Sequence, residues 1–134
     1  MAIKKLGYVI NAFDASEHLE GILKEIRSEI DYVAAIWQKL SYWKNPMDPE
    51  DMKELERLKE IGLIDELIEF KPDFSKYSRE QECDKRNIAI NIAKQQGCSH
   101  VISADADEYY SLEQFKYAKD VINKKGWSIT YCSY

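Results

Sequence analysis

Three carboxylates lie within four residues of one another late in the chain, at Asp105, Asp107 and Glu108. They follow a short apolar run, Val101 and Ile102, which is expected to form a buried strand. Side chains that emerge where such a strand ends lie at the edge on which open parallel α/β sheets bind ligands. Because three acids so close together repel one another, we expect a cation to offset them. A hard divalent ion that holds a phosphorylated substrate is the best candidate.

The overall composition limits the class of protein. The 134 residues fit one domain and suffice for a reasonable core, and 45% hydrophobic with 32% charged residues is ordinary for a soluble globular protein. The net charge of -5 provides no positive surface for nucleic acid or for an anionic membrane, so we expect neither as a partner.

Cysteine usage and the first residues point to a reducing compartment. Cys83, Cys98 and Cys132 are odd in number and widely spaced, which argues against a disulfide framework and against structural zinc. Residues 1–7 lack the long apolar core of a signal peptide, and no window approaches the roughly 20 apolar residues of a membrane helix. We therefore expect a cytoplasmic protein without a membrane span.

Strand-like and helix-like patterns alternate along the chain. Apolar runs predict strands at residues 8–13, 32–37 and 63–70 and around 101–102, and alternation predicts a last strand at 127–134. Helical spacing and capping residues predict four helices between them: from Asp14 and Ser16 to Ile30, from Asp48 and Pro49 to Gly62, from the capping box Ser78–Gln81 to Gly97, and from the capping box Ser111–Gln114 to Gly126. The third helix is expected to bury Ile88, Ala89, Ile92 and Ala93.

This order of elements predicts an α/β fold, a three-layer α/β/α sandwich with a mostly parallel sheet and right-handed crossovers. Polar residues follow three of the predicted strands on the same edge: Asn11 and Asp14, Gln38 and Ser41, and Asp105 and Asp107. Because the loops at the carboxyl ends of parallel strands converge, we expect these residues to share one ligand crevice.

A family resemblance supports the same arrangement. A first strand that ends in a polar loop is followed by a helix with Asp84-Lys85-Arg86-Asn87-Ile88-Ala89 and by a strand that ends in Asp105-Ala106-Asp107-Glu108. These features resemble the nucleotide-sugar half of GT-A fold glycosyltransferases, most closely the family-two type, over a range from about Gly7 to Tyr134. The resemblance implies binding of a nucleotide-diphosphate sugar and transfer of the sugar to an acceptor that the sequence does not identify.

The resemblance also implies roles for individual residues. Asp107 would bind Mn²⁺ or Mg²⁺, and Asp105 would join this metal site by contacting a metal-bound water or the ribose. A metal held in this way would neutralise charge on the departing diphosphate. The nucleotide-sugar-binding residues implied are Asn11, Phe13 and Asp14 in the first loop, Gln38 after the second strand, Arg86 on the helix, where it could bind phosphate in a bidentate manner, and Asp105.

The chain departs from the family pattern at two points. The second strand usually ends in an acidic pair, whereas here it ends Trp37-Gln38-Lys39. The chain also stops where the second half of the family's domain would begin, the half that brings the acceptor pocket and the catalytic base. We therefore expect residues 1–134 to form a single truncated domain that binds the donor at most. Surface left exposed by the missing half would favour a homodimer.

Two other functions remain open at this stage. The first is a non-catalytic nucleotide-binding or assembly module with the same fold. The second is a metal-dependent phosphohydrolase, although that type of enzyme carries its Asp-x-Asp after the first strand rather than the fourth. At the level of residues, the acids could simply favour the N-terminus of the next helix. Lys85 and Arg86 could equally lie on a solvated helix face.

Overall fold

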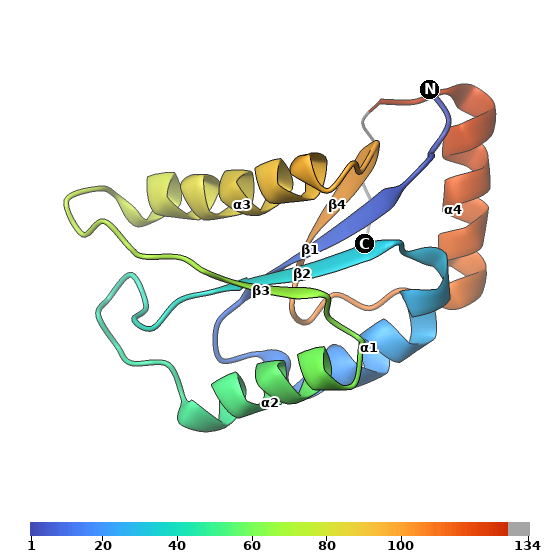
Figure 1. Ribbon diagram of the computed structural model, residues 1–134. Helices are drawn as coiled ribbons and strands as arrows, with labels where there is room; N and C mark the ends of the chain where they lie inside the picture. The colour runs from blue at the N-terminus through green and yellow to red at the C-terminus, as the bar shows by residue number, and fades with distance from the viewer. Residues whose placement is uncertain (129–134) are drawn as a thin grey trace.

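The computed structural model describes residues 1–128 and has a parallel sheet at its centre (Figure 1). The strands are β1 (Leu6–Ala12), β2 (Tyr32–Trp37), β3 (Glu66–Glu69) and β4 (His100–Asp105). They lie in the order β3-β2-β1-β4, and every pairing between them is parallel. The α/β prediction with a parallel sheet is therefore confirmed.

Helices cover both faces of the sheet. They are α1 (Leu19–Ile26), flanked by the 3-10 turns η1 (Ser16–His18) and η2 (Arg27–Glu29), then α2 (Pro49–Glu60), α3 (Ser78–Gln95) and α4 (Leu112–Lys125). In the described part of the chain, α3 lies along one face, and the other three helices lie on the opposite side (Figure 1). The predicted three layers are present.

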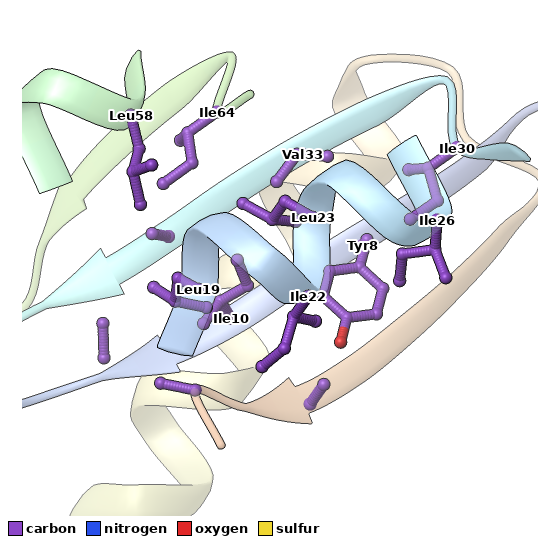
Figure 2. Packing of buried hydrophobic residues seen from close by; sticks show 14 of the residues in the cluster. Tyr8, Ile10, Leu19, Ile22, Leu23, Ile26, Ile30, Val33, Leu58 and Ile64 are labelled. Carbon is purple, nitrogen blue, oxygen red and sulfur yellow. The ribbon is translucent and has the colours of Figure 1, made fainter. Parts of the chain in front are cut away.

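The core is divided by the sheet into two clusters. The larger one joins Tyr8 and Ile10 of β1 to the apolar faces of α1 and α2, as Figure 2 shows with Leu19, Leu23 and Leu58. The smaller one joins Val9 of β1 and the α3-facing side of β2 to Ala89 and Ala93 of α3. β1 is thus buried on both faces, as its continuous apolar run predicts.

The two outer strands differ from the prediction. β3 is only four residues long because Leu63 and Ile64 are still bonded to the end of α2, where both N–H groups donate to the carbonyl of Leu58. β4 lies at the edge of the sheet formed by the described residues, and Val101 and Ile102 are half-buried. The expectation of a buried strand at this point is wrong: β4 is only partly buried, since in the described structure it pairs with β1 alone.

Two helix starts also differ from the prediction. α3 follows Tyr77, whose N–H donates to the Glu80 carboxylate at 3.3 Å, so the predicted capping box is displaced by one residue. The prediction that Ile88 is buried is wrong: the buried stripe of α3 runs at four-residue intervals from Gln81 through Ala89 to Ala93, and Ile88 lies beside it with 41% exposure. The segment after β1 begins as the 3-10 turn η1 without a side-chain cap. The starts at Asp48 and Ser111 are confirmed, since both side chains accept a backbone N–H bond.

No helix in residues 1–128 is long and apolar enough to cross a membrane. Of the predicted last strand, residues 129–134 lie outside the described residues, and so does Cys132.

Candidate functional site

The register between β1 and β4 brings predicted site residues together. Asn11 is the Cα partner of Asp105, at the carboxyl ends of two neighbouring strands. Both residues lie on the face of the sheet that α3 covers, because side chains alternate along a strand and Val9 packs on that face. The predicted convergence of Asn11 and Asp105 is therefore confirmed.

Arg86 connects α3 to this edge of the sheet. Its guanidinium donates to Asp105 Oδ1 at 2.5 Å, to Ser103 Oγ at 3.2 Å and to Glu82 Oε1 at 3.0 Å. The side chain is only 26% exposed, so the alternative of a solvated helix face does not apply to it. Arg86 holds one oxygen of Asp105 and fixes the direction of that carboxylate.

Lys85, to which the sequence assigns no site role, is buried beside these residues, so the alternative of a solvated helix face is wrong for it as well. Its side chain is 1% exposed, and Nζ donates to the backbone carbonyl of Ala12, the last residue of β1, at 3.2 Å. Burial lowers the pKa of Lys85 to about 8, with a smaller contribution from the neighbouring Arg86. A signal was available in the sequence, because Lys85 lies four residues from Ala89 and therefore on the buried stripe of the helix.

The turn after β4 is organised by Glu108. Its carboxylate accepts the Asp105 N–H at 3.1 Å and the Tyr110 hydroxyl at 2.8 Å. Glu108 thus has a structural role in this turn. Asp107 lies exposed in the same turn and makes no hydrogen bond or ion pair with another residue of the described chain. Its carboxylate is available to a ligand.

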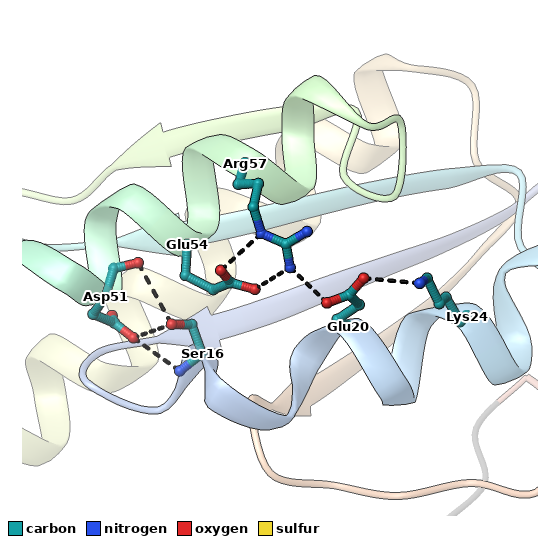
Figure 3. A network of polar contacts seen from close by, with 6 residues as sticks. All are labelled: Ser16, Glu20, Lys24, Asp51, Glu54 and Arg57. Carbon is teal, nitrogen blue, oxygen red and sulfur yellow. Dashed lines mark hydrogen bonds and ion pairs between the residues drawn. The ribbon is translucent and has the colours of Figure 1, made fainter.

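The loop after β1 is attached to the first turn of α2 (Figure 3). The Asp51 carboxylate accepts the N–H groups of Asp14 at 3.0 Å and Ser16 at 2.8 Å, and also the Ser16 hydroxyl. The Asp14 carboxylate in turn accepts the Asp48 N–H at 2.8 Å. Asp14 therefore uses its carboxylate to hold α2, while Phe13 lies half-buried beside it.

Gln38 is buried where β2 ends, with 2% exposure. Its Nε2 donates to the carbonyl of Leu40 at 2.8 Å, inside its own loop. Among the described residues, the structure thus groups Asn11, Arg86 and Asp105 around one point and places Asp107 in the adjoining turn. The side chains of Asp14 and Gln38 are engaged in hydrogen bonds elsewhere.

The carboxylates at this edge suit a divalent metal only when a ligand completes its coordination. Residues 1–128 contain no group of three His, Cys, Asp or Glu side chains that could hold an ion by themselves. One or two carboxylates are nevertheless sufficient for Mg²⁺ or Mn²⁺ when phosphate oxygens and water complete the coordination shell. The second oxygen of Asp105 and the carboxylate of Asp107 fit a site of that kind.

Two cavities lie along α3. One of about 390 Å³ lies between α3 and the segment after β3, where Phe70, Gln81 and Ile88 contribute to its wall. The other, of about 740 Å³, lies at the first turns of α3 beside Tyr77 and Cys83. Neither is lined by any of the predicted nucleotide-sugar or metal residues.

Comparisons of the chain with protein-family models, with curated proteins and with solved structures found no significant match.

Proposed function

We propose that this protein binds a nucleotide-diphosphate sugar at the carboxyl edge of β1 and β4, through a divalent metal at Asp105 and Asp107, and serves glycosyl transfer. The resemblance of the Lys-Arg-Asn helix and the Asp-x-Asp strand to GT-A glycosyltransferases supports this proposal. The acceptor and the residues that would activate it are outside the proposal.

The observation that carries the proposal is the arrangement around Asp105. A guanidinium from α3 holds one carboxylate oxygen in place, and a second carboxylate without a partner in the described chain follows two residues later. Exposed acids that serve only as a helix entry need no such support. The position of these groups, at the carboxyl edge of a parallel sheet, is where ligands bind in this class of fold.

Different residues would have different roles at this site. Asp107 is the stronger candidate for direct metal ligation, since Arg86 does not occupy it, and Asp105 would bind through its second oxygen. A metal bound here would supply positive charge to a diphosphate leaving group. Arg86 would position Asp105, since its guanidinium nitrogens already donate to Glu82, Ser103 and Asp105.

A non-catalytic nucleotide-binding or assembly module is the second candidate, and one observation favours it. The side chains of Asp14 and Gln38, both expected to contact the nucleotide, are engaged in other hydrogen bonds, that of Asp14 with the start of α2 and that of Gln38 within its own loop. A protein that has this fold but lacks the full set of nucleotide contacts would show weak or no discrimination among sugar nucleotides.

Calorimetric titration of UDP-glucose with and without Mn²⁺ tests the proposal. We expect Mn²⁺-dependent binding that Asp107→Ala weakens by about 30-fold, which corresponds to about 2 kcal/mol. Asp120→Ala is the matched control, because it removes an exposed aspartate from α4 that pairs only with Lys124 in the described chain. The panel of donors should include GDP- and dTDP-sugars, since the base is not specified.

The outcomes separate the candidates. Equal weakening by Asp107→Ala and Asp120→Ala would show a general charge effect and refute the metal site. Binding without a metal requirement would favour the non-catalytic module. Indifference to every sugar nucleotide and to Mn²⁺ would exclude donor binding altogether.

A further inference from the structure

Lys85 places a positive charge inside the protein directly beneath the candidate site. It is 1% exposed, and its one hydrogen bond within the described chain is to the Ala12 carbonyl. No carboxylate of the described chain lies within ion-pair distance of Nζ. Three hydrogens on an ammonium and a single acceptor leave this group only partly satisfied.

The charged groups that face Lys85 come from two elements. Glu82 and Arg86 are on α3 itself, and Asp105 is at the end of β4. Both carboxylates are bonded to Arg86, so the anionic groups nearest to Lys85 are already shared with another cation. Tyr42 lies near Glu82, and burial raises the pKa of Tyr42 to about 12, so it remains neutral around pH 8.

Stability does not account for a lysine at this position. A buried charge without an ion pair is unfavourable, and an apolar side chain of similar length would pack there at lower cost. A buried polar group that stability does not explain is typical of a functional site.

We propose that Lys85 is a positioning residue of the site: its buried ammonium holds the end of β1 and makes the binding of a phosphate-bearing ligand dependent on uptake of a proton. The inference rests on the proposed function and adds that ligand binding is coupled to proton uptake. A ligand anion at the carboxyl edge stabilises the charged form of Lys85, and by reciprocity the charged form of Lys85 strengthens binding of the anion.

The pH range in which ligand binding takes up a proton follows from the pKa of Lys85 in the free protein. With a pKa of about 8, Lys85 is charged in only part of the molecules at pH 8. Anion binding shifts that balance toward the charged form, so we expect uptake of roughly half a proton at pH 8 and little below pH 7. The affinity for the anion falls as the pH rises from 7 to 9.

Calorimetry of UDP-glucose with Mn²⁺ at pH 8, in two buffers of different ionisation enthalpy, measures this proton uptake. The diphosphate diester of UDP-glucose does not titrate near pH 8, so the proton must come to the protein. We expect Lys85→Met to abolish the uptake, to flatten the affinity between pH 7 and 9, and to weaken binding at pH 7 by about tenfold. Gln81→Met is the matched control, because it places the same side chain one helical turn away without removing a charge.

A second measurement does not depend on the nucleotide. NMR titration of the Lys85 side chain with sodium sulfate, against sodium chloride at equal ionic strength, is expected to raise the pKa of Lys85 in sulfate. Binding of UDP-glucose without proton uptake, or the same loss in Gln81→Met as in Lys85→Met, would overturn the inference while the proposed function stands. A sulfate-dependent shift without UDP-glucose binding would leave the inference and refute the proposed function. Absence of both effects would refute both.

Discussion

At the scale of single residues, the largest departure from ordinary packing is Lys85. Its ordinary pKa of 10.5 falls to about 8 on burial, so the folded protein carries an unfavourable charge at neutral pH. We expect Lys85→Met to raise the free energy of unfolding of the ligand-free protein at pH 7 by about 1–3 kcal/mol, despite the lost bond to Ala12. Urea denaturation of both proteins measures the difference.

The difference in free energy of unfolding between the wild type and Lys85→Met is expected to change with pH in a defined direction. Between pH 8 and 10 the unfolded chain keeps the Lys85 proton while the folded protein releases it. The unfolded state therefore binds more protons, and the free energy of unfolding of the wild type rises with pH relative to Lys85→Met. The gap between the two proteins is expected to be largest below pH 8 and to narrow toward pH 10. A variant less stable than wild type at pH 7 would instead make Lys85 a purely structural residue.

Which site residues the sequence predicts depends on what else their side chains can bind. Arg86 and Asp105 come together as expected, because strand register and helix packing determine their positions. Asp14 was predicted for the same site, but its carboxylate meets the N–H of Asp48, thirty-four residues later. A contact between residues so far apart in the chain produces no recognisable pattern in the local sequence. Lys85 was missed because a charged residue on a helix is expected to face water.

At the scale of elements, Asp51 is the residue through which α2 holds the loop after β1 (Figure 3). It is buried, with 8% exposure, and accepts three hydrogen bonds from Asp14 and Ser16. Asp51→Ala leaves these donors unsatisfied, so we expect the free energy of unfolding to fall by about 2–3 kcal/mol. Arg57→Ala serves as the comparison on the same helix. Its ion pairs with Glu20 and Glu54 lie at the surface, where solvent screens them.

The two variants are compared by urea denaturation at pH 7. We expect a clear shift of the midpoint for Asp51→Ala and almost none for Arg57→Ala. Equal shifts would mean that the surface ion pairs, rather than the buried carboxylate, attach α2 to the sheet.

The helices and strands themselves were predicted well where local chemistry is decisive. Asp48-Pro49 and Ser111 begin helices as expected, and Gly62, Gly97 and Gly126 adopt positive φ where helices end. The start of α3 was displaced by one residue because Tyr77, which lacks a typical capping side chain, precedes the helix while Glu80 accepts its N–H. The predicted length of β3 is too great because the apolar residues Leu63 and Ile64 hydrogen-bond to the end of α2 and do not belong to the strand.

At the scale of the whole molecule, alternation of strands and helices was sufficient to predict a parallel sheet between two helical layers. The sequence does not determine which strand lies at the edge. β1 and β2 are buried on both faces, whereas β3 and β4 are half-buried, so the sheet is most stable at its centre. Gly7 illustrates the tight centre, because a Cβ atom at this position would lie 2.9 Å from the Cys98 Sγ.

This gradient predicts the pattern of amide hydrogen exchange. Amides of β1 and β2 are expected to exchange through global unfolding, and those of β3 at least about tenfold faster through local opening.

A donor bound at the proposed site would contact β4 and α3 rather than β3. UDP-glucose with Mn²⁺ should therefore slow exchange at residues 103–108 and in the first half of α3, and leave residues 66–69 unchanged. Asp107→Ala should remove the protection. Protection spread evenly over the four strands would reflect global stabilisation alone. Protection confined to the cavity beside Phe70 and Ile88 would place the ligand between α3 and the segment after β3.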